Sequence, residues 1–192
     1  LRISKTKISK KEIFVKLWLF TAKCSAKVEM PCPMQNQFRP NAAVIIANKQ
    51  GQVLLCERGF PGYAEHTIQI VQGGIDPGET PRQAAEREVM EELGIAQEDF
   101  EIIDELDQTF TYEWPKRYIE ETLVKYPNNP YIGQEQHFFL AMFSGATKFT
   151  LDAHHREFDT VRWGSPQELL DGIWEAKRPG TEAALKAFGL LP

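Results

Sequence analysis

Cysteine is scarce in this chain: Cys24, Cys32 and Cys56 are the three cysteines among 192 residues. Their odd number and unrelated spacings argue against a disulfide scaffold or a zinc cluster and favour a reducing cytoplasm. No apolar run approaches the roughly 20 residues that a transmembrane helix needs. With 22 basic and 27 acidic side chains the net charge is −5, which argues against sequence-independent coating of DNA but permits a local basic groove.

The N-terminal stretch differs in composition from the rest. Residues 1–29 carry seven lysines and one arginine against two glutamates. Their apolar segment, residues 13–22, resembles a short signal-peptide core, but Lys16 interrupts it and it is too short to cross a bilayer. We therefore expect residues 1–33 to be an N-terminal extension, disordered or not native, and residues 34–192 to form one domain. A secretion signal is the alternative.

Beyond the extension, short β-rich runs surround one strong helical pattern. Strands are expected at residues 43–47, 53–56, 67–71, 100–106, 109–114, 136–142 and 160–163. A hairpin is expected over residues 48–51, loops over 59–64 and 126–134, and short helices over 166–170 and 181–188. The loop 126–134 is rich in proline, asparagine and glycine and is a candidate substrate lip. Strands on both sides of a central helix predict a mixed α/β sandwich.

The central helix has start and stop signals at both ends. Thr80 is a good N-cap, Pro81 occupies the first helical position, and Gln83 completes a capping box. Gly94 follows the last apolar residue and is typical of a helix end. These signals predict a helix over Pro81–Leu93.

Three acidic residues of this helix share one face. Glu88, Glu91 and Glu92 stand at positions i, i+3 and i+4, where their carboxylates repel one another. A hard divalent cation would remove that repulsion and suits oxygen ligands. Arg87 is the one base nearby, on the neighbouring side of the helix, and no lysine balances the stripe. The alternative is a solvated acidic face.

The spacing around this helix resembles the Nudix box at every defined position. The match consists of Gly73, five residues, Glu79, seven residues, and then Arg87-Glu88-Val89-Met90-Glu91-Glu92-Leu93-Gly94-Ile95. The resemblance implies an α/β/α sandwich with a central mixed β-sheet. It also implies hydrolysis of a nucleoside diphosphate linked to another moiety, with Mg²⁺ or Mn²⁺ as the cofactor.

Segments outside the box extend the resemblance towards the bacterial RNA pyrophosphohydrolases, a family that overlaps with dinucleoside polyphosphate hydrolases. They occur in the order of that family and run from about residue 38 to residue 188. They are Phe38-Arg39-Pro40-Asn41, Gln69, Gln72-Gly73-Gly74, Trp114-Pro115-Lys116-Arg117, Ile132-Gly133-Gln134-Glu135-Gln136, Glu157-Phe158-Asp159, Arg162-Trp163 and Lys177-Arg178.

The resemblance also implies roles for the acidic residues. Glu88, Glu91 and Glu92, with the backbone carbonyl of Gly73, would bind two or three divalent ions. Glu157 matches a glutamate outside the box that contacts metal or acts as the general base. Glu157 is the first candidate for the base, Glu91 the second and Glu92 the third.

Two further groups of residues follow from the same resemblance. Within the box, Glu79 and Arg87 would brace the turn between loop and helix through an ion pair, and Gly94 would be structural. Five basic residues would contact phosphate or nucleotide, although each taken singly fits plain surface: Arg39, Arg58, Lys116, Arg117 and Lys177. Guanidinium groups suit phosphate oxygens and can stack on a base.

One departure from the family concerns aromatic residues near the end of the chain. Some relatives carry a stacking aromatic residue directly before the Lys-Arg pair, where this chain has Ala176, with Trp174 two positions earlier. The nucleotide preference of those relatives therefore does not transfer directly. Tyr112 alternates with apolar positions and is expected in the core.

The leading expectation is an enzyme that removes pyrophosphate from the 5′-triphosphate end of RNA, leaving a 5′-monophosphate, as a step in mRNA decay. Single-stranded ends suit recognition because their bases are free to stack and to form hydrogen bonds. The alternatives are a pyrophosphohydrolase of dinucleoside polyphosphates or nucleoside triphosphates, and an inactive nucleotide-binding module. We expect a cytoplasmic monomer or homodimer that has no DNA or membrane partner.

Overall fold

A computed structural model describes residues 37–58, 68–145, 149–151 and 157–192. The expected extension 1–33 and the expected loop 59–64 lie outside these residues. The strands are β1 (Gln37–Ala47), β2 (Val53–Glu57), β3 (Ile68–Gln69), β4 (Val71–Gly74), β5 (Phe100–Glu105), β6 (Phe110–Glu113), β7 (Tyr131–Phe143) and β8 (Thr160–Gly164). The helices are α2 (Pro81–Leu93), the short 3₁₀ turn η1 (Gln97–Asp99), α3 (Lys116–Lys125), α4 (Pro166–Gly172) and α5 (Arg178–Ala187).

The eight strands form one mixed sheet. Five of them run in the order β3-β2-β1-β7-β5, while β4 pairs with β1, β6 with β7 and β8 with β2. The central pair β1–β7 is parallel, and the neighbouring pairs are antiparallel. This confirms the expected α/β fold with a central mixed sheet. Within the described ranges, no helix has the length and hydrophobicity needed to cross a bilayer.

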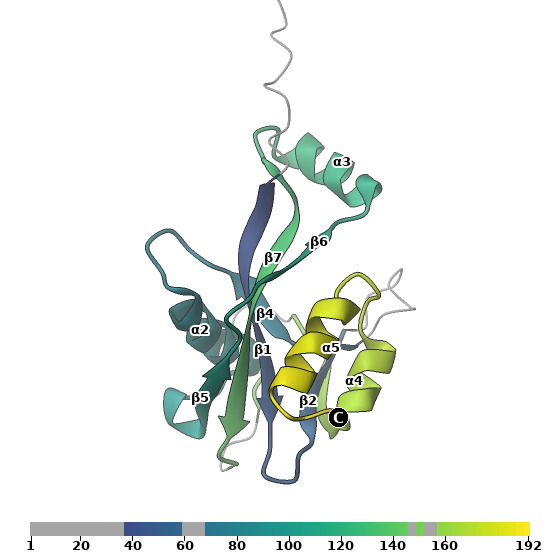
Figure 1. The fold of residues 1–192 in the computed structure, drawn as a ribbon. Coiled ribbons are helices and arrows are strands. Elements are labelled where there is room, and N and C mark those ends of the chain that lie inside the picture. Colours follow the sequence, from purple (N-terminus) through teal and green to yellow (C-terminus); the bar gives the residue numbers. More distant parts are fainter. Residues whose placement is uncertain (1–36, 59–67, 146–148, 152–156) are drawn as a thin grey trace, which may run out of the picture. The chain divides into compact units, whose positions relative to one another are not determined.

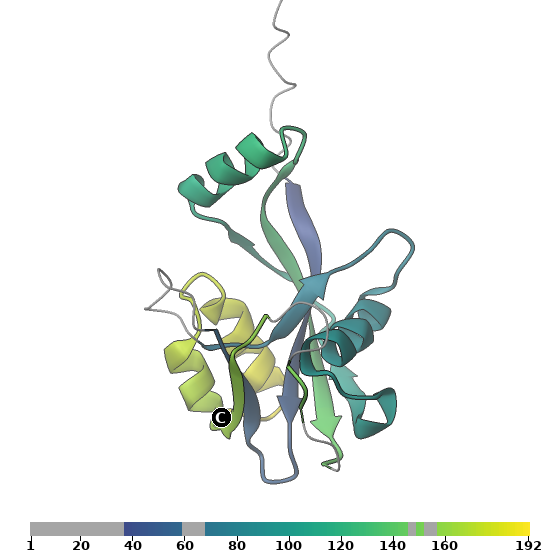
Figure 2. The same ribbon diagram turned by 180° about the vertical axis from the view of Figure 1, so that it is seen from behind.

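Strand β1 is buried on both faces because helices cover both sides of the sheet. Ala42, Val44 and Ile46 pack on the side of α2, whereas Ala43 and Ile45 pack on the side of α4 and α5. Successive strand residues point to opposite faces, so one continuous apolar run supplies both cores. Figures 1 and 2 show α2 on one side of the sheet and α4 and α5 on the other.

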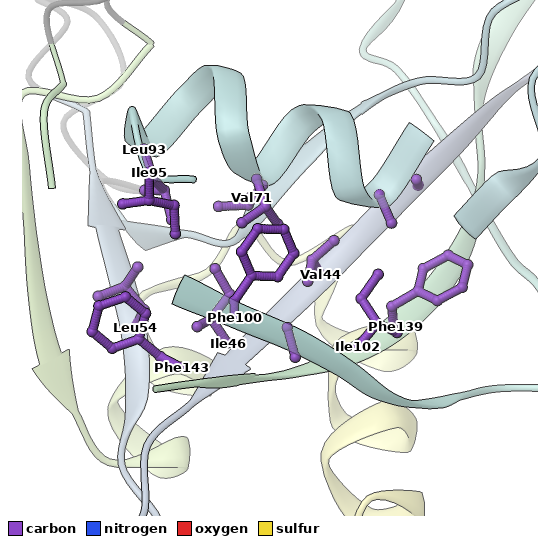
Figure 3. Packing of buried hydrophobic residues seen from close by; sticks show 14 of the residues in the cluster. Val44, Ile46, Leu54, Val71, Leu93, Ile95, Phe100, Ile102, Phe139 and Phe143 are labelled. Carbon is purple, nitrogen blue, oxygen red and sulfur yellow. The ribbon is translucent and has the colours of Figure 1, made fainter. Parts of the chain in front are cut away.

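The core under α2 fixes the position of the acidic helix. Figure 3 shows Val44 and Ile46 of β1 with Val71 of β4 and Leu93 of α2 in the same packed layer as Phe100 of β5. Burying side chains of this size stabilises the fold by roughly 1.5–3 kcal/mol each. The helix is therefore held against the sheet along its apolar face, with its acidic residues at the edge of that contact.

Both ends of α2 are as the sequence predicts. Thr80 accepts a hydrogen bond from the backbone N–H of Gln83, and the Gln83 side chain accepts one from the backbone of Thr80. Gly94 ends the helix in the left-handed region at φ 60°, with its N–H donating to the Met90 carbonyl. The hairpin over residues 48–51 is also confirmed, because Ala47 pairs with Val53 across it.

The region after β6 differs from the expectation. Residues 126–134 were expected to be a loop, but β7 begins at Tyr131, and Lys116–Lys125 form the unexpected helix α3. Gly133 suggests a loop by its residue type, yet it lies within strand β7. Glycine is needed there because a Cβ would come 2.0 Å from the Tyr112 carbonyl oxygen. Helix α3 lacks a side-chain cap at Pro115, which removes the sequence signal for its start.

Gly94 offers a test of the junction between α2 and the segment that follows β7. A Cβ at Gly94 would lie 2.3 Å from the Thr150 carbonyl oxygen, whereas a Cβ at Gly51, which has a similar φ of 74°, meets no atom within 4 Å. We expect Gly51→Ala to lower the free energy of unfolding by about 1–2 kcal/mol through backbone strain alone. Gly94→Ala should cost at least about 1 kcal/mol more, because backbone must also move. Urea unfolding of both variants measures the difference, and equal losses would contradict the contact.

Candidate active site

The end of strand β4 places bare backbone against an acidic side chain. A Cβ atom at Gly73 would lie 1.8 Å from the carboxyl carbon of Glu88. The Glu88 side chain is only 13% exposed. Glycine at this position therefore leaves the space that the Glu88 carboxylate occupies beside the strand.

Arg87 ties the preceding loop to the helix. Its Nε and Nη2 donate to the two carboxylate oxygens of Glu79 at 2.9 and 3.0 Å, and Nη2 also donates to the Gly74 carbonyl at 2.9 Å. The Arg87 guanidinium, helped by the backbone N–H of Asp76, lowers the pKa of Glu79. The expected Glu79–Arg87 ion pair is confirmed.

Arg87 also contacts the acidic stripe, which corrects one sequence-based expectation. The sequence places Arg87 on the neighbouring side of the helix, but its Nη1 donates to Glu88 at 2.6 Å and to Glu91 at 3.2 Å. A guanidinium has five donors in one plane, so a long side chain can serve the loop and the stripe together. The stripe is therefore partly balanced by this one cation.

Glu92 is the most buried of the acidic residues of α2. The residue is 9% exposed, and the backbone N–H of Gln72 donates to its Oε2 at 3.3 Å. Burial raises the pKa of Glu92 well above its ordinary value, and the carboxylates of Glu157 and Glu88 raise it further. Burial likewise raises the pKa of Glu88. Glu157 itself is exposed and lies within hydrogen-bonding reach of Glu92, so the structure brings these three carboxylates together.

The chemistry of this cluster fits a divalent cation. Within the described residues, no three acidic, histidine or cysteine side chains are already arranged to hold a metal, and Arg87 pairs with Glu88 and Glu91. A hard cation takes carboxylate ligands and would remove the repulsion that raises the pKa of Glu92. Glu88 and Glu157 both act electrostatically on Glu92, whereas Glu91, 56% exposed, pairs with Arg87.

A buried amide network lies behind the cluster. The Asn41 side chain donates to the Gly73 carbonyl at 2.8 Å, and the Gln136 side chain donates to the Gln72 side chain at 3.0 Å. Asn41 and Gln136 are each 1% exposed and join at 3.5 Å. The network orients the Gly73 carbonyl and Gln72. Sequence reasoning gave Asn41 and Gln136 no role, although a polar residue inside an apolar strand run signals such a network.

A cavity of about 880 Å³ adjoins this region. Three of the five basic residues expected at the substrate line it, namely Arg39, Arg58 and Lys177. Lys116 and Arg117 lie on the exposed helix α3 and are not among the lining residues. Most of the remaining lining is aromatic or polar: Gln69, Gln72, Tyr112, Trp114, Tyr118, Thr122, Tyr126, Asn129, Tyr131, Gln134 and Trp174.

Lys177 connects the cavity electrostatically with the acidic cluster. The residue is 9% exposed, and burial lowers the pKa of its amine to about 8, against the opposing effect of Glu92 and Glu157. Arg39 lines the same cavity, and its guanidinium covers Gly74. Basic groups for phosphate and carboxylates for a cation are therefore neighbours.

Two aromatic residues near Lys177 line the cavity, a role that the sequence did not predict for Tyr112. Tyr112 is buried, as predicted, but its hydroxyl donates to the Gln134 side chain, and both residues line the cavity. The ring of Trp174 packs edge-on against Tyr112, with centroids 5.4 Å apart. The cavity thus contains an aromatic ring from this segment even though Ala176 directly precedes Lys177.

Comparison with known proteins agrees with this geometry. Residues 37–184 match the NUDIX domain model, and the chain belongs to the Nudix family. An RNA pyrophosphohydrolase of Aeromonas hydrophila subsp. hydrophila is 40% identical over 158 residues, covering 80% of this chain and 85% of that protein. One of Proteus mirabilis is 39% identical over 154 residues, covering 79% and 82%.

Solved structures of low sequence identity share the fold. The E. coli dihydroneopterin triphosphate pyrophosphohydrolase has a TM-score of 0.59 at 19% identity, covering 79% of this chain and 96% of that one. A C. elegans Ap4A hydrolase binary complex has a TM-score of 0.53 at 22% identity, covering 77% and 96%. Members of the Nudix family generally use divalent metal ions, which agrees with the carboxylate cluster.

Gly73 provides a test of the carboxylate arrangement. We expect Gly73→Ala to displace the Glu88 carboxylate and to weaken Mn²⁺ binding by about 10- to 100-fold. Glu86→Gln is the control, because Glu86 lies on α2 and pairs with Arg82 at 3.5 Å, outside the carboxylate cluster. Calorimetric titration with Mn²⁺ measures both variants. Undiminished binding by Gly73→Ala would contradict the role of Glu88.

Glu92 should make the metal-free protein less stable as the pH rises. Because the pKa of Glu92 is raised in the folded state, folding of the ionised form is penalised above that pKa, and the penalty disappears at lower pH. In EDTA, Glu92→Gln should therefore melt at a higher temperature than wild type at about pH 8, and the gap should close towards about pH 5.

Addition of Mn²⁺ should reverse that order, since wild type gains more stability from the ion than Glu92→Gln does. Glu86→Gln is the matched control on the same helix, where Glu86 pairs with Arg82 at 3.5 Å. Scanning calorimetry with and without Mn²⁺ tests both statements. A Glu92→Gln variant that is less stable than wild type in EDTA at every pH would count against the electrostatic account.

Proposed function

We propose that this chain removes pyrophosphate from the 5′-triphosphate end of RNA and leaves a 5′-monophosphate, a step in mRNA decay. The observation that carries the proposal is the placement of Glu88, Glu92 and Glu157 beside a cavity lined by Arg39 and Lys177. Membership of the Nudix family supports the same function, as do the relatives named RNA pyrophosphohydrolase, which are about 40% identical to this chain.

The proposed cofactor is Mg²⁺ or Mn²⁺, in two to three ions. Glu88, Glu91 and Glu92 would hold them, with the Gly73 carbonyl and Glu157. When bound, such ions neutralise phosphate charge and lower the pKa of a coordinated water. Asn41 fixes the direction of the Gly73 carbonyl through its 2.8 Å hydrogen bond.

The side chains of this protein would bind and orient the triphosphate. Arg39 and Arg58 offer guanidinium donors to phosphate oxygens, and the Lys177 amine adds a charge at the buried end of the cavity. The Arg87–Glu79 pair holds the loop in place beneath the carboxylates. Lys116 and Arg117, which lie outside the cavity lining, would act only on more distant parts of the RNA.

Glu157 is the proposed general base. It is exposed to water, whereas Glu92 is buried and Glu91 pairs with Arg87. In the reaction one water oxygen forms a bond to phosphorus while one phosphoanhydride P–O bond breaks. The proton from water passes to the carboxylate, and pyrophosphate leaves as the second product.

Hydrolysis of dinucleoside polyphosphates or nucleoside triphosphates would use the same chemistry, so substrate comparison is the test. We expect faster hydrolysis of triphosphorylated RNA, measured as released pyrophosphate, than of dGTP or of diadenosine pentaphosphate, whose products are two nucleotides, with Mg²⁺ and with Mn²⁺. Glu157→Gln should lower kcat on RNA by about 10²- to 10⁴-fold, the range for a lost general base. Glu86→Gln serves again as the control.

The absence of phosphate or pyrophosphate release from RNA, with turnover of a free nucleotide intact, would reject the RNA proposal in favour of the alternatives. If the wild-type protein hydrolyses none of these substrates, the inactive nucleotide-binding module is the remaining alternative. We place the enzyme in the cytoplasm, where RNA ends are processed, as a monomer or homodimer.

A further inference from the structure

Helix α3 and the turn after it form the outer wall of the cavity. Tyr118 and Thr122 of α3 and Tyr126 directly after it line the same cavity as Arg39 and Lys177. Residues at this spacing of four share one helix face, so that face is directed at the cavity. In both Figure 1 and Figure 2, α3 lies on the same side of the sheet as α4 and α5, away from α2.

This wall is aromatic and open to solvent. Tyr118 is 44% exposed and Tyr126 is 57% exposed, and no residue of α3 is buried. The Trp114 ring meets Tyr118 edge-on, with centroids 5.3 Å apart. Because α3 adds nothing to the core, packing of the fold does not explain these exposed rings, and grouped exposed aromatics indicate a binding surface. We call Trp114, Tyr118 and Tyr126 the aromatic wall.

The chemistry of the aromatic wall suits nucleic acid bases. Every base has a flat π face, and stacking on an aromatic side chain does not depend on base identity. The Lys125 amine lies 5.4 Å from the Tyr126 ring, where it adds positive charge beside the stacking surface. Thr122 and Asn129, also in the lining, offer hydrogen bonds to base edges. Glu120 and Glu121 of α3 are acidic and are not among the lining residues.

The lining of the cavity offers both basic groups and aromatic rings to one substrate. Its volume of about 880 Å³ lies near the upper end of the range of about 300–1,000 Å³ that small-ligand pockets span. Arg39, Arg58 and Lys177, which suit a triphosphate, line the same cavity as the aromatic wall. A chain that places its 5′ phosphates at Arg39 and Lys177 has further bases to offer the aromatic wall, whereas a nucleoside triphosphate has a single base.

We propose that the aromatic wall stacks the bases of RNA that follow the reacting end, so that the enzyme selects RNA over free nucleotides by chain length. This inference rests on the proposed function. It assigns Trp114, Tyr118 and Tyr126 to substrate selection and gives them no part in bond cleavage.

The test measures kcat/KM for triphosphorylated substrates of increasing length: a nucleoside triphosphate and RNAs of two, four and eight nucleotides. For wild type we expect the value to rise with length, mainly through a lower KM. In the double variant Tyr118→Ala/Tyr126→Ala, the ratio between the eight-nucleotide RNA and the nucleoside triphosphate should fall by about 5- to 150-fold, the range that one base–aromatic stack supplies.

Two further variants separate stacking from structural damage. Tyr118→Phe/Tyr126→Phe should keep the length dependence, because stacking needs the ring and not the hydroxyl. Val124→Ala, on the same helix and 85% exposed but absent from the cavity lining, should keep it as well. If either control loses the length dependence, the alanine substitutions act by disturbing the structure of α3 and not by removing stacking, and the proposal is wrong.

The outcomes separate this inference from the proposed function. If wild type releases pyrophosphate from RNAs of every length with equal kcat/KM, or if the double alanine variant keeps the gain, the aromatic wall proposal is wrong and the RNA activity stands. If wild type releases nothing from RNA, the proposed function itself fails. If the double variant loses only its turnover of diadenosine pentaphosphate, the wall serves the second nucleoside of a dinucleotide, which also overturns the inference.

Discussion

The repulsion among carboxylates at the end of α2 is the constraint on which the other features depend. Burial makes ionisation of Glu92 costly, and the neighbouring carboxylates of Glu157 and Glu88 add to that cost. A fold selected for stability alone would not keep three acids in such a place. Arg87 offsets part of the repulsion, and the rest is compensated by the apolar packing beneath the helix. The site therefore lowers the stability of the fold, and the packing of the surrounding core offsets this loss.

The sheet holds the acidic helix and the turn before it in fixed positions. Strand β1 supplies apolar residues to two cores, so both helical layers are fixed to the same strand. Asn41, at the near end of the same buried run, orients the Gly73 carbonyl. The acidic helix, the turn before it and the basic residues of the cavity thus share one rigid support. The precision of the site comes from β1 more than from any single contact in the site.

Local signals explain why α2 could be predicted closely and α3 could not. The bounds of α2 follow from Thr80, Gln83 and Gly94, each of which acts within a few residues of the helix end. Helix α3 has no such cap and no buried face, and the i, i+4 pair of Arg117 and Glu121 is too weak a signal to separate it from a loop. The carboxylate stripe was predictable because its spacing lies within one helix. The contacts of Arg87 with that stripe, and the partnership of Asn41 with Gln136, depend on distant strands and were not.

The start of strand β7 could not be predicted from the sequence either. Its first residues look like a loop because Gly133 follows a segment rich in proline and asparagine, and only the closeness of the Tyr112 backbone explains the glycine. No residue of α3 is buried, so this helix contributes to neither core. The rings proposed to stack the RNA bases and the carboxylates proposed to hold the cation therefore come from different segments, and a substitution in one segment leaves the other intact.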